Sequence, residues 1–475
     1  MTNHIERLRQ ARDSENLLAV SSACREALAV EAKLGLEWAE VAALALEAGD
    51  EVAARNAALK LTEEAPAHLD SWTWLAAAHS ALGENEAALN VLERLLSAAP
   101  KDASLNRRAG RVLLDLGRTA EAEHRYRQAL HADASSGSAW EGLAASRRFR
   151  PSDSELVEME QMRIGLGESA DPVERGILSY ALAKAYEDQG EYDLAARRIA
   201  EGAAFYRSGA GFNIEAHANG VDHVLRTYDD RFADQHLESG LLDARPVFVI
   251  AAPGCAADWL TDVLAAGEDV ARLPRNNALF WMSAAPLGAH TREDLEAAMR
   301  GQRGEGVLAE VGRTYLRFVE ERVGRTRRVI DPASVNELAA GAASLSLPAA
   351  RFIVIERDPA DLAWACYKRR FRRARHWTYH PDDVARVIAA NRRLVGRWSE
   401  LFPDRVLRVS YEALLENLED EIRRIAFFSG VEADASVAEA WMRQDVLNAN
   451  PAGLHKQAGE RFVPVAEALE RAGLS

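Results

Sequence analysis

The stretch RPVFVIAAPGCAADWL, residues 245–260, contains an apolar run, a break and a helix-like segment in close succession. The apolar run 247–252 is typical of a short buried strand, and Pro253 ends it. A strand, a tight turn and a helix start form the frame of phosphate-binding loops, because N–H groups at a helix N-terminus attract anions. This turn, however, contains no Lys, Arg, Ser or Thr, and it contains an acid, Asp258. The sequence therefore predicts the frame of an anion site without the side chains that hold an anion.

The pattern of the sequence from residue 245 to the C-terminus predicts an α/β domain. Short β-like runs alternate with helical stretches, which predicts a parallel sheet with helices on both faces. The β-like runs are 246–252, 350–357 and a weaker one at 404–412, and the clearest helical stretches are 381–402 and 418–431. Ligands of such sheets bind at the carboxyl ends of the strands. The segments APGCAADW and RDPADLAWACY occupy those ends here.

The first third of the chain repeats itself with a shift of 34 residues. Glycines and small residues recur at this period, and tryptophan recurs with Asn106 as the exception. The aligned sets are Gly49, Gly83 and Gly117; Ala54, Ala88 and Ala122; and Trp38, Trp72 and Trp140. This pattern resembles the tetratricopeptide repeat (TPR). We therefore expect an α-helical TPR solenoid over 1–150, further helical pairs and a linker over 151–244, and the α/β domain over 245–475.

Stacked repeats leave a concave groove, and binding in that groove is the default role of such arrays. By repeat position, Arg107, Arg111 and Arg148 are expected to face the groove. Three arginines there predict a protein partner with an acidic peptide. The alternative is that they are solvated arginines without a ligand.

Composition excludes several classes of function. A length of 475 residues predicts two or three domains, and a formal charge of −15 argues against a nucleic-acid binder. Three widely separated cysteines favour neither a disulfide framework nor a zinc site, and no metal is expected. The N-terminus has no apolar signal core and no run of about 18 apolar residues occurs, so we expect a cytoplasmic protein without a membrane span. The oligomeric state is left open.

Two segments of the α/β region, ERDPADLAWACYKRRF (356–371) and RVLRVSYEALLENLEDEIRRIAFFSGV (405–431), resemble the sulfotransferase family, and more narrowly its bacterial members with TPR repeats in front. The resemblance implies a P-loop-like α/β fold that binds 3′-phosphoadenosine 5′-phosphosulfate (PAPS). It also implies transfer of a sulfonate to a hydroxyl or an amine.

The family's first loop reads Pro-Arg-Ser-Gly-Thr-Thr and holds the 5′-phosphosulfate, and only its proline is kept here. The aligned positions are Pro253, Gly254, Cys255, Ala256, Ala257 and Asp258. A phosphate placed about 4 Å from the carboxylate of Asp258 meets a repulsion of roughly 4 kcal/mol at an effective dielectric of 20. The resemblance thus implies a vestigial cofactor loop, in which Cys255 is a small buried residue in place of serine.

Other parts of the implied cofactor site are changed as well. The arginine that binds the 3′-phosphate is present as Arg357, but its serine partner is Ala365 and the lysine of a third motif is Pro332. The C-terminal segment 448–465 lacks the pattern of the family's cover loop, and Arg275 stands near the place of the acidic base. No catalytic residue is predicted. We expect a TPR scaffold with an inactive sulfotransferase-like domain and no cofactor; the alternative is an active, PAPS-dependent sulfotransferase.

The segment KRRFRRAR, residues 368–375, is strongly basic. Its charged residues are Lys368, Arg369, Arg370, Arg372, Arg373 and Arg375. Such a cluster is predicted to bind an acidic tail, a polyanion or a glycan acid. The alternative is a solvated face that pairs with acidic residues of the same protein.

Overall fold

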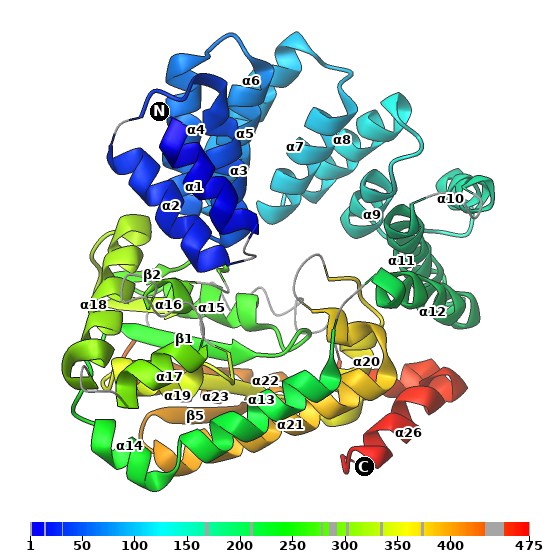
Figure 1. Cartoon of the computed structure of the whole chain (residues 1–475). Coiled ribbons are helices and arrows are strands. Elements are labelled where there is room, and N and C mark those ends of the chain that lie inside the picture. Colours follow the sequence, from blue (N-terminus) through cyan, green and yellow to red (C-terminus); the bar gives the residue numbers. More distant parts are fainter. Residues whose placement is uncertain are drawn as a thin grey trace. The chain divides into compact units, whose positions relative to one another are not determined.

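The computed structural model describes residues 2–13, 16–30, 32–166, 171–209, 212–276, 279–284, 292–300, 304–332, 336–371, 375–432 and 451–474. Figure 1 shows the chain coloured along its sequence. It forms two compact units, and each is assembled from three segments. Unit 1 contains Met1–Trp74, Ala218–Asp358 and Ala390–Ala452, and unit 2 contains Leu75–His217, Pro359–Ala389 and Gly453–Ser475. The three domains predicted from the sequence divide the chain in a different way, and their boundaries stay a prediction.

Unit 1 begins with helices and continues into the sheet. Its N-terminal elements are α1 (Thr2–Asp13), α2 (Leu17–Ala29), η1 (Gly35–Glu37), α3 (Trp38–Ala48) and α4 (Glu51–Glu64), and α5 (Leu69–Ala81) continues into unit 2. Its later helices are α14 (Asp230–His236), α15 (Ala257–Ala265), α16 (Leu279–Met282), α17 (Arg292–Arg300), α18 (Gly304–Val323), α19 (Ala340–Ser346), α22 (Tyr411–Glu416) and α23 (Leu418–Ser429).

Unit 2 is helical over its described residues. The repeat helices are α6 (Asn85–Ala98), α7 (Ala103–Asp115), α8 (Thr119–Ala132), α9 (Gly137–Ser146), α10 (Ser154–Gly165), α11 (Pro172–Asp188) and α12 (Tyr192–Gly209). The later elements are α20 (Pro359–Tyr367), η3 (His376–Tyr379), η5 (Leu454–Phe462) and α26 (Val463–Arg471). Two helices, α13 (Ile214–Thr227) and α21 (Pro381–Leu401), run from one unit into the other.

The glycines of the repeat have the backbone that their spacing predicts. Gly49, Gly83 and Gly117 follow α3, α5 and α7 with φ of +78°, +76° and +74°. This left-handed conformation ends a helix at little cost only when the residue lacks a Cβ. Gly190, between α11 and α12, has φ of +80° and extends the pattern into the helical pairs predicted over 151–244.

Asn106, the exception at the tryptophan position of the repeat, makes the hydrogen bond that two of the three tryptophans make, whereas Trp38 donates to Glu64 instead. Trp72 and Trp140 donate their indole N–H to the carbonyl oxygens six residues earlier, Pro66 at 2.9 Å and Ala134 at 3.0 Å. The side-chain amide of Asn106 donates to Pro100, also six residues earlier, at 2.9 Å. Asparagine therefore fits this repeat position because its amide N–H donates to the corresponding backbone carbonyl, six residues earlier.

A five-stranded parallel sheet lies in unit 1. Its strands are β1 (Pro246–Ala251), β2 (Val270–Arg272), β3 (Arg328–Asp331), β4 (Arg351–Glu356) and β5 (Val406–Ser410), in the order β2-β3-β1-β4-β5. All four pairings are parallel, with Phe248 opposite Phe352 in the central pair. Five consecutive residues of β1 are buried, so both faces of the sheet are covered. The predicted fold class, a helical repeat array followed by a parallel α/β domain, is confirmed.

The three predicted strands are β1, β4 and β5, whereas β2 and β3 were missed. These two strands have three and four residues, which is too short for a periodic signal. Among the residues that the structure describes, no helix is long and apolar enough to cross a membrane.

A buried charge network in unit 1 joins the first helical pairs to α18. Asp50 caps α4 and is fully buried, and its carboxylate accepts from Ser21 Oγ at 2.7 Å and Arg25 Nε at 2.5 Å. Arg25 also pairs with Glu321 of α18 at 3.1 Å and lies over the ring of Phe318. The turn that begins α4 is therefore bound to α2 directly and to α18 through Arg25.

The neighbouring residue Glu51 makes a second set of bonds in the same place. Its Oε2 accepts from Arg322 Nη2 at 2.9 Å and from Asn276 Nδ2 at 2.8 Å, and Asn276 also donates to the carbonyl of Gly49 at 2.6 Å. The side chain of Arg322 is 1% exposed. Helices α1 to α4 thus belong to the same compact unit as the sheet.

Candidate functional site

The loop between β1 and α15 lies at the carboxyl end of the central strand. Gly254 has φ of +90° and Ala256 has φ of +52°, so two residues of the turn are left-handed. Ala256 caps α15 without a side-chain hydrogen bond to its first turn. Cys255 is fully buried and Ala257 is 6% exposed, so neither presents a polar group to a ligand. The predicted strand–turn–helix frame is present. Cys255 is buried, as expected for a small residue in place of serine.

Asp258 does not stand alone in the first turn of α15. Its Oδ1 accepts from Arg272 Nη2 at 3.0 Å and from Arg275 Nε at 2.7 Å. Arg272 also pairs with Asp262, one turn along the helix, at 3.0 Å. The simple repulsion expected from sequence was incomplete, because two guanidinium groups offset the charges of the two carboxylates.

Arg357, the one charged residue kept from the implied 3′-phosphate site, is 3% exposed. Its Nη1 donates to the carbonyl of Gly254 at 2.7 Å and its Nη2 to the carbonyl of Pro451 at 3.0 Å. Its guanidinium lies 4.5 Å from the ring centre of Tyr411, a cation–π distance. Arg357 therefore ties the β1 loop to the C-terminal segment by contacts with the protein itself.

The remaining positions of the implied cofactor site carry little ligand chemistry. Ala365 is fully buried in α20 and presents only a methyl group. Asp331, at the end of β3, is buried and accepts from the hydroxyl of Tyr315 at 2.7 Å. Residues 333–335 and 448–450 lie outside the described part of the chain.

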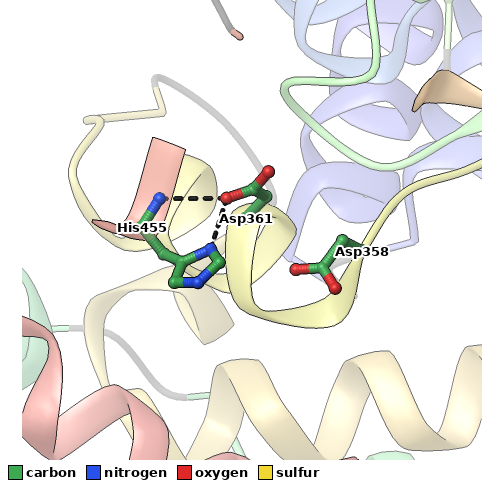
Figure 2. Close-up of side chains that lie close together, drawn as sticks. All are labelled: Asp358, Asp361 and His455. Carbon is green, nitrogen blue, oxygen red and sulfur yellow. Dashed lines mark hydrogen bonds and ion pairs between the residues drawn. The ribbon is translucent and has the colours of Figure 1, made fainter. Parts of the chain in front are cut away.

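Asp361, the second acid of RDPADLAWACY, holds the C-terminal segment in unit 2. Figure 2 shows the carboxylate of Asp361, in the first turn of α20, facing His455, and it also draws Asp358, which precedes that helix. The carboxylate of Asp361 accepts from the backbone N–H of Gly453 at 2.6 Å, the backbone N–H of His455 at 2.9 Å and ring Nδ1 of His455 at 2.6 Å. Asp361 is 1% exposed, and both of its oxygens are used in this way, so we interpret the group as a structural anchor.

The basic segment 368–375 is partly bound to acids of unit 2. Arg370 pairs with Glu141 through two bonds of 2.6 and 2.5 Å, and Lys368 lies 3.4 Å from Glu187. Burial alone would lower the pKa of Arg370, but the hydrogen bond and charge of Glu141 raise the pKa overall. For these two residues the contacts favour pairing within the protein. Arg369 is exposed and Arg375 is half-buried, while Arg372 and Arg373 lie outside the described residues.

Arginines of α7 lie in a pocket of about 280 Å³ in the repeat array of unit 2. Arg107, Arg108 and Arg111 line it together with Ser80 and the ring of Tyr126. The structure thus brings two of the three predicted groove arginines together.

Arg148 lies elsewhere, in a second pocket of about 490 Å³ lined also by Phe149 and Asp188.

Sequence reasoning missed the two residues that shape the β1 loop most. Arg272 was not singled out, and Arg275 was noted only as the residue near the position of the acidic base. Arg272 is the last residue of the short strand β2 and Arg275 follows it, and the sequence did not reveal this strand. Once β2 is known to lie in the same parallel sheet, arginines at its carboxyl end are expected near the β1 loop.

Two family models match the chain. Residues 246–435 match the sulfotransferase family, and residues 69–112 match the tetratricopeptide repeat. The chain thus has a sulfotransferase-like domain that follows a tetratricopeptide-repeat match. The resemblance drawn from the sequence is thereby confirmed for both parts.

The individual proteins that this chain resembles have low sequence identity to it. A protein of Aquifex aeolicus is 21% identical over 292 residues, which cover 59% of this chain and 38% of that protein. The chain therefore spans well under half the length of this curated relative. Among solved structures, the sulfotransferase domain of the Synechococcus olefin synthase is 14% identical, with a TM-score of 0.32, and covers 50% of this chain and 96% of that one. A tetratricopeptide repeat protein from Parabacteroides merdae is 18% identical, with a TM-score of 0.34, and covers 44% and 84%.

Proposed function

We propose that the protein is a TPR scaffold whose sulfotransferase-family domain has lost its cofactor site. The observation that carries this proposal is the position of Arg357. Both terminal nitrogens of its guanidinium donate to carbonyls of the protein, Gly254 and Pro451, where the family uses this arginine for a 3′-phosphate. A phosphate would have to displace these bonds, and breaking charge-assisted hydrogen bonds costs about 1.5–3 kcal/mol each. The residues present do not fit PAPS, so we derive no sulfonate-transfer step.

The partner of the scaffold, in this proposal, is a protein segment rich in carboxylates. The pocket in the repeat array has three arginines over one helix face, and Tyr126 forms part of its lining. Arginine binds carboxylates through two parallel hydrogen bonds, which selects acidic groups by geometry as well as charge. The overall charge of −15 works against unspecific capture of acidic chains, so binding depends on this local surface.

A second candidate function, a PAPS-dependent sulfotransferase with changed contacts, is favoured by one observation. Arg272 and Arg275 supply two positive groups beside the β1 loop, although the loop itself has none. In that case both arginines would leave Asp258 and bind the donor.

Calorimetry with 3′-phosphoadenosine 5′-phosphate separates the two functions. We expect the full chain to show no binding heat at millimolar nucleotide, because Arg357 and the two loop arginines are engaged within the protein. Micromolar binding that Arg357→Ala abolishes would establish the cofactor site and overturn the scaffold proposal. The folded state of Arg357→Ala is checked by circular dichroism.

The groove is tested with a fluorescent peptide of ten glutamates and fluorescence anisotropy. We expect binding to the full chain to weaken by at least about tenfold in the double variant Arg107→Ala/Arg111→Ala, since each lost charge-assisted bond is worth roughly 1.5–3 kcal/mol. Arg118→Ala, in the exposed turn between α7 and α8, is the matched control and should bind as the wild type does. Equal affinity of all three proteins would show that the groove arginines bind no acidic peptide.

A further inference from the structure

We propose that the carboxylate of Asp258 is an internal occupant of an oxyanion site formed by Arg272, Arg275 and the first turn of α15. The inference deepens the proposed function and rests on it, because it names the group that fills the vestigial site. Two guanidinium groups converge on a single oxygen of Asp258, at 3.0 and 2.7 Å. An oxygen held between two arginines is the arrangement in which proteins bind the oxygens of sulfate and phosphate.

The position of this oxygen adds to the argument. Asp258 is the second residue of α15, where the backbone N–H groups have no partner within the helix. The capping residue Ala256 has no side-chain acceptor to satisfy them. A negative charge placed there is stabilised by the helix end as well as by the arginines. The carboxylate of Asp258 therefore sits where the two sources of positive potential overlap.

The site is also reachable from solvent. The side chains of Asp258 and Arg275 are 54% and 43% exposed. An ion pair at this exposure is weak, with a typical worth of about 0–1 kcal/mol. The arginines are thus held near the loop without being locked there. If Asp258 loses its charge, the two arginines lose their anionic partner and can bind a small oxyanion from solution.

Asp262 provides a matched control on the same helix. It pairs with Arg272 at 3.0 Å and is 41% exposed, so it resembles Asp258 in charge, environment and partner. It lies one turn farther from the helix N-terminus, so it does not occupy the position at which the helix end and the two arginines act on Asp258. Removing its charge therefore changes the net charge of the region equally and leaves the proposed internal occupant in place.

The experiment compares sulfate binding by the full-length wild type, Asp258→Asn and Asp262→Asn, measured by calorimetry with inorganic sulfate at constant ionic strength. We expect Asp258→Asn to bind sulfate at least about tenfold more tightly than the wild type, because it removes the competing charge without changing the shape of the side chain. Asp262→Asn should change the affinity by less than about threefold, since that carboxylate lies one turn away from the proposed oxyanion position and leaves Asp258 in place. In Asp258→Asn/Arg275→Gln the gain should disappear.

The outcomes separate this inference from the proposed function. A folded Asp258→Asn that binds sulfate no better than the wild type would overturn the internal occupant, while the scaffold function would stand. Equal gains in Asp258→Asn and Asp262→Asn would also overturn it, because they would show a general charge effect. Micromolar binding of 3′-phosphoadenosine 5′-phosphate by the wild type would overturn both. Wild-type crystals soaked in sulfate give a second measurement, and an ion bound to Arg275 beside an intact Asp258 contact would contradict the proposal.

Discussion

Two turns at the same repeat position, 49–51 and 117–119, have the same backbone and different surroundings. Each begins with a left-handed glycine, Gly49 and Gly117, that ends the first helix of a pair. In the first turn the next two residues, Asp50 and Glu51, are buried acids, and Asp50 pairs with Arg25 while Glu51 binds Arg322 of α18 and Asn276. In the later turn Arg118 forms an exposed pair with Glu121 at 2.7 Å. The repeat thus fixes the backbone of a turn, and the surroundings decide the chemistry that the turn carries.

This difference has a consequence for function. A turn that is buried against the α/β body holds its helices in place, so the first helical pairs form part of the same compact unit as the sulfotransferase-like sheet. The later pairs keep their turns exposed, and the pocket with Arg107 and Arg111 lies among them. Under the proposed function, the acidic partner therefore binds the repeats of unit 2, and α1–α4 have a structural role.

The largest expected effect comes from breaking the buried pair of the first turn. Arg322→Ala leaves Glu51 buried beside Asn276 without its cationic partner, which costs about 3–5 kcal/mol. Thermal unfolding should begin several degrees earlier, and the amides of α3 and α4 should exchange faster with deuterium. Arg118→Ala, which removes the exposed pair of the later turn, should leave both measurements unchanged.

A double variant keeps this prediction testable if Arg322→Ala does not fold. Arg322→Met/Glu51→Gln removes both charges and keeps most of the volume, and replacing a whole buried ion pair is often neutral. We expect it to recover most of the lost stability. If Arg322→Ala unfolds as the wild type does, the network does not hold the first helices on α18.

The shared backbone of the two turns was predictable from sequence, and their difference was not. The 34-residue spacing alone aligned Gly49, Gly83 and Gly117, because a left-handed helix end restricts which residue fits. Burial of Asp50 and Glu51 depends on Arg25, Arg322 and Asn276, which are remote in sequence or lie on another element. Acidic residues after a glycine turn are usually exposed, so no local pattern marks them as buried.

The candidate site shows the same division between frame and contacts. The strand–turn–helix frame of the β1 loop could be predicted, because apolar periodicity and Pro253 are local signals. The partners of Asp258 could not, since Arg272 and Arg275 reach it through a three-residue strand that gives no periodic signal. Arg357 was predicted at the carboxyl end of β4, but its two carbonyl acceptors depend on the fold of the C-terminal segment.

The smallest effect we expect is a difference in pH dependence between the two regions. Burial, against the opposing effect of Arg322, raises the pKa of Glu51 above its ordinary value of 4.5. The hydrogen bond from Arg118 lowers the pKa of Glu121 below 4.5. The two carboxyl groups should therefore respond to acid in opposite directions.

The sign follows from which state binds the proton more tightly. Glu51 binds its proton more tightly in the folded state than in the unfolded state. Its contribution to stability is therefore full below pH 4.5 and is lost as the pH rises through its raised pKa. Folded Glu121 binds the proton less tightly, and its contribution is present above pH 4.5 and is lost as the pH falls through its lowered pKa. Melting temperatures of the wild type, Glu51→Gln and Glu121→Gln between pH 8 and about pH 4 test this. As the pH falls, the wild type should gain stability relative to Glu51→Gln and lose it relative to Glu121→Gln. Differences of the same sign would mean that the turn 49–51 is as open to solvent as its later counterpart.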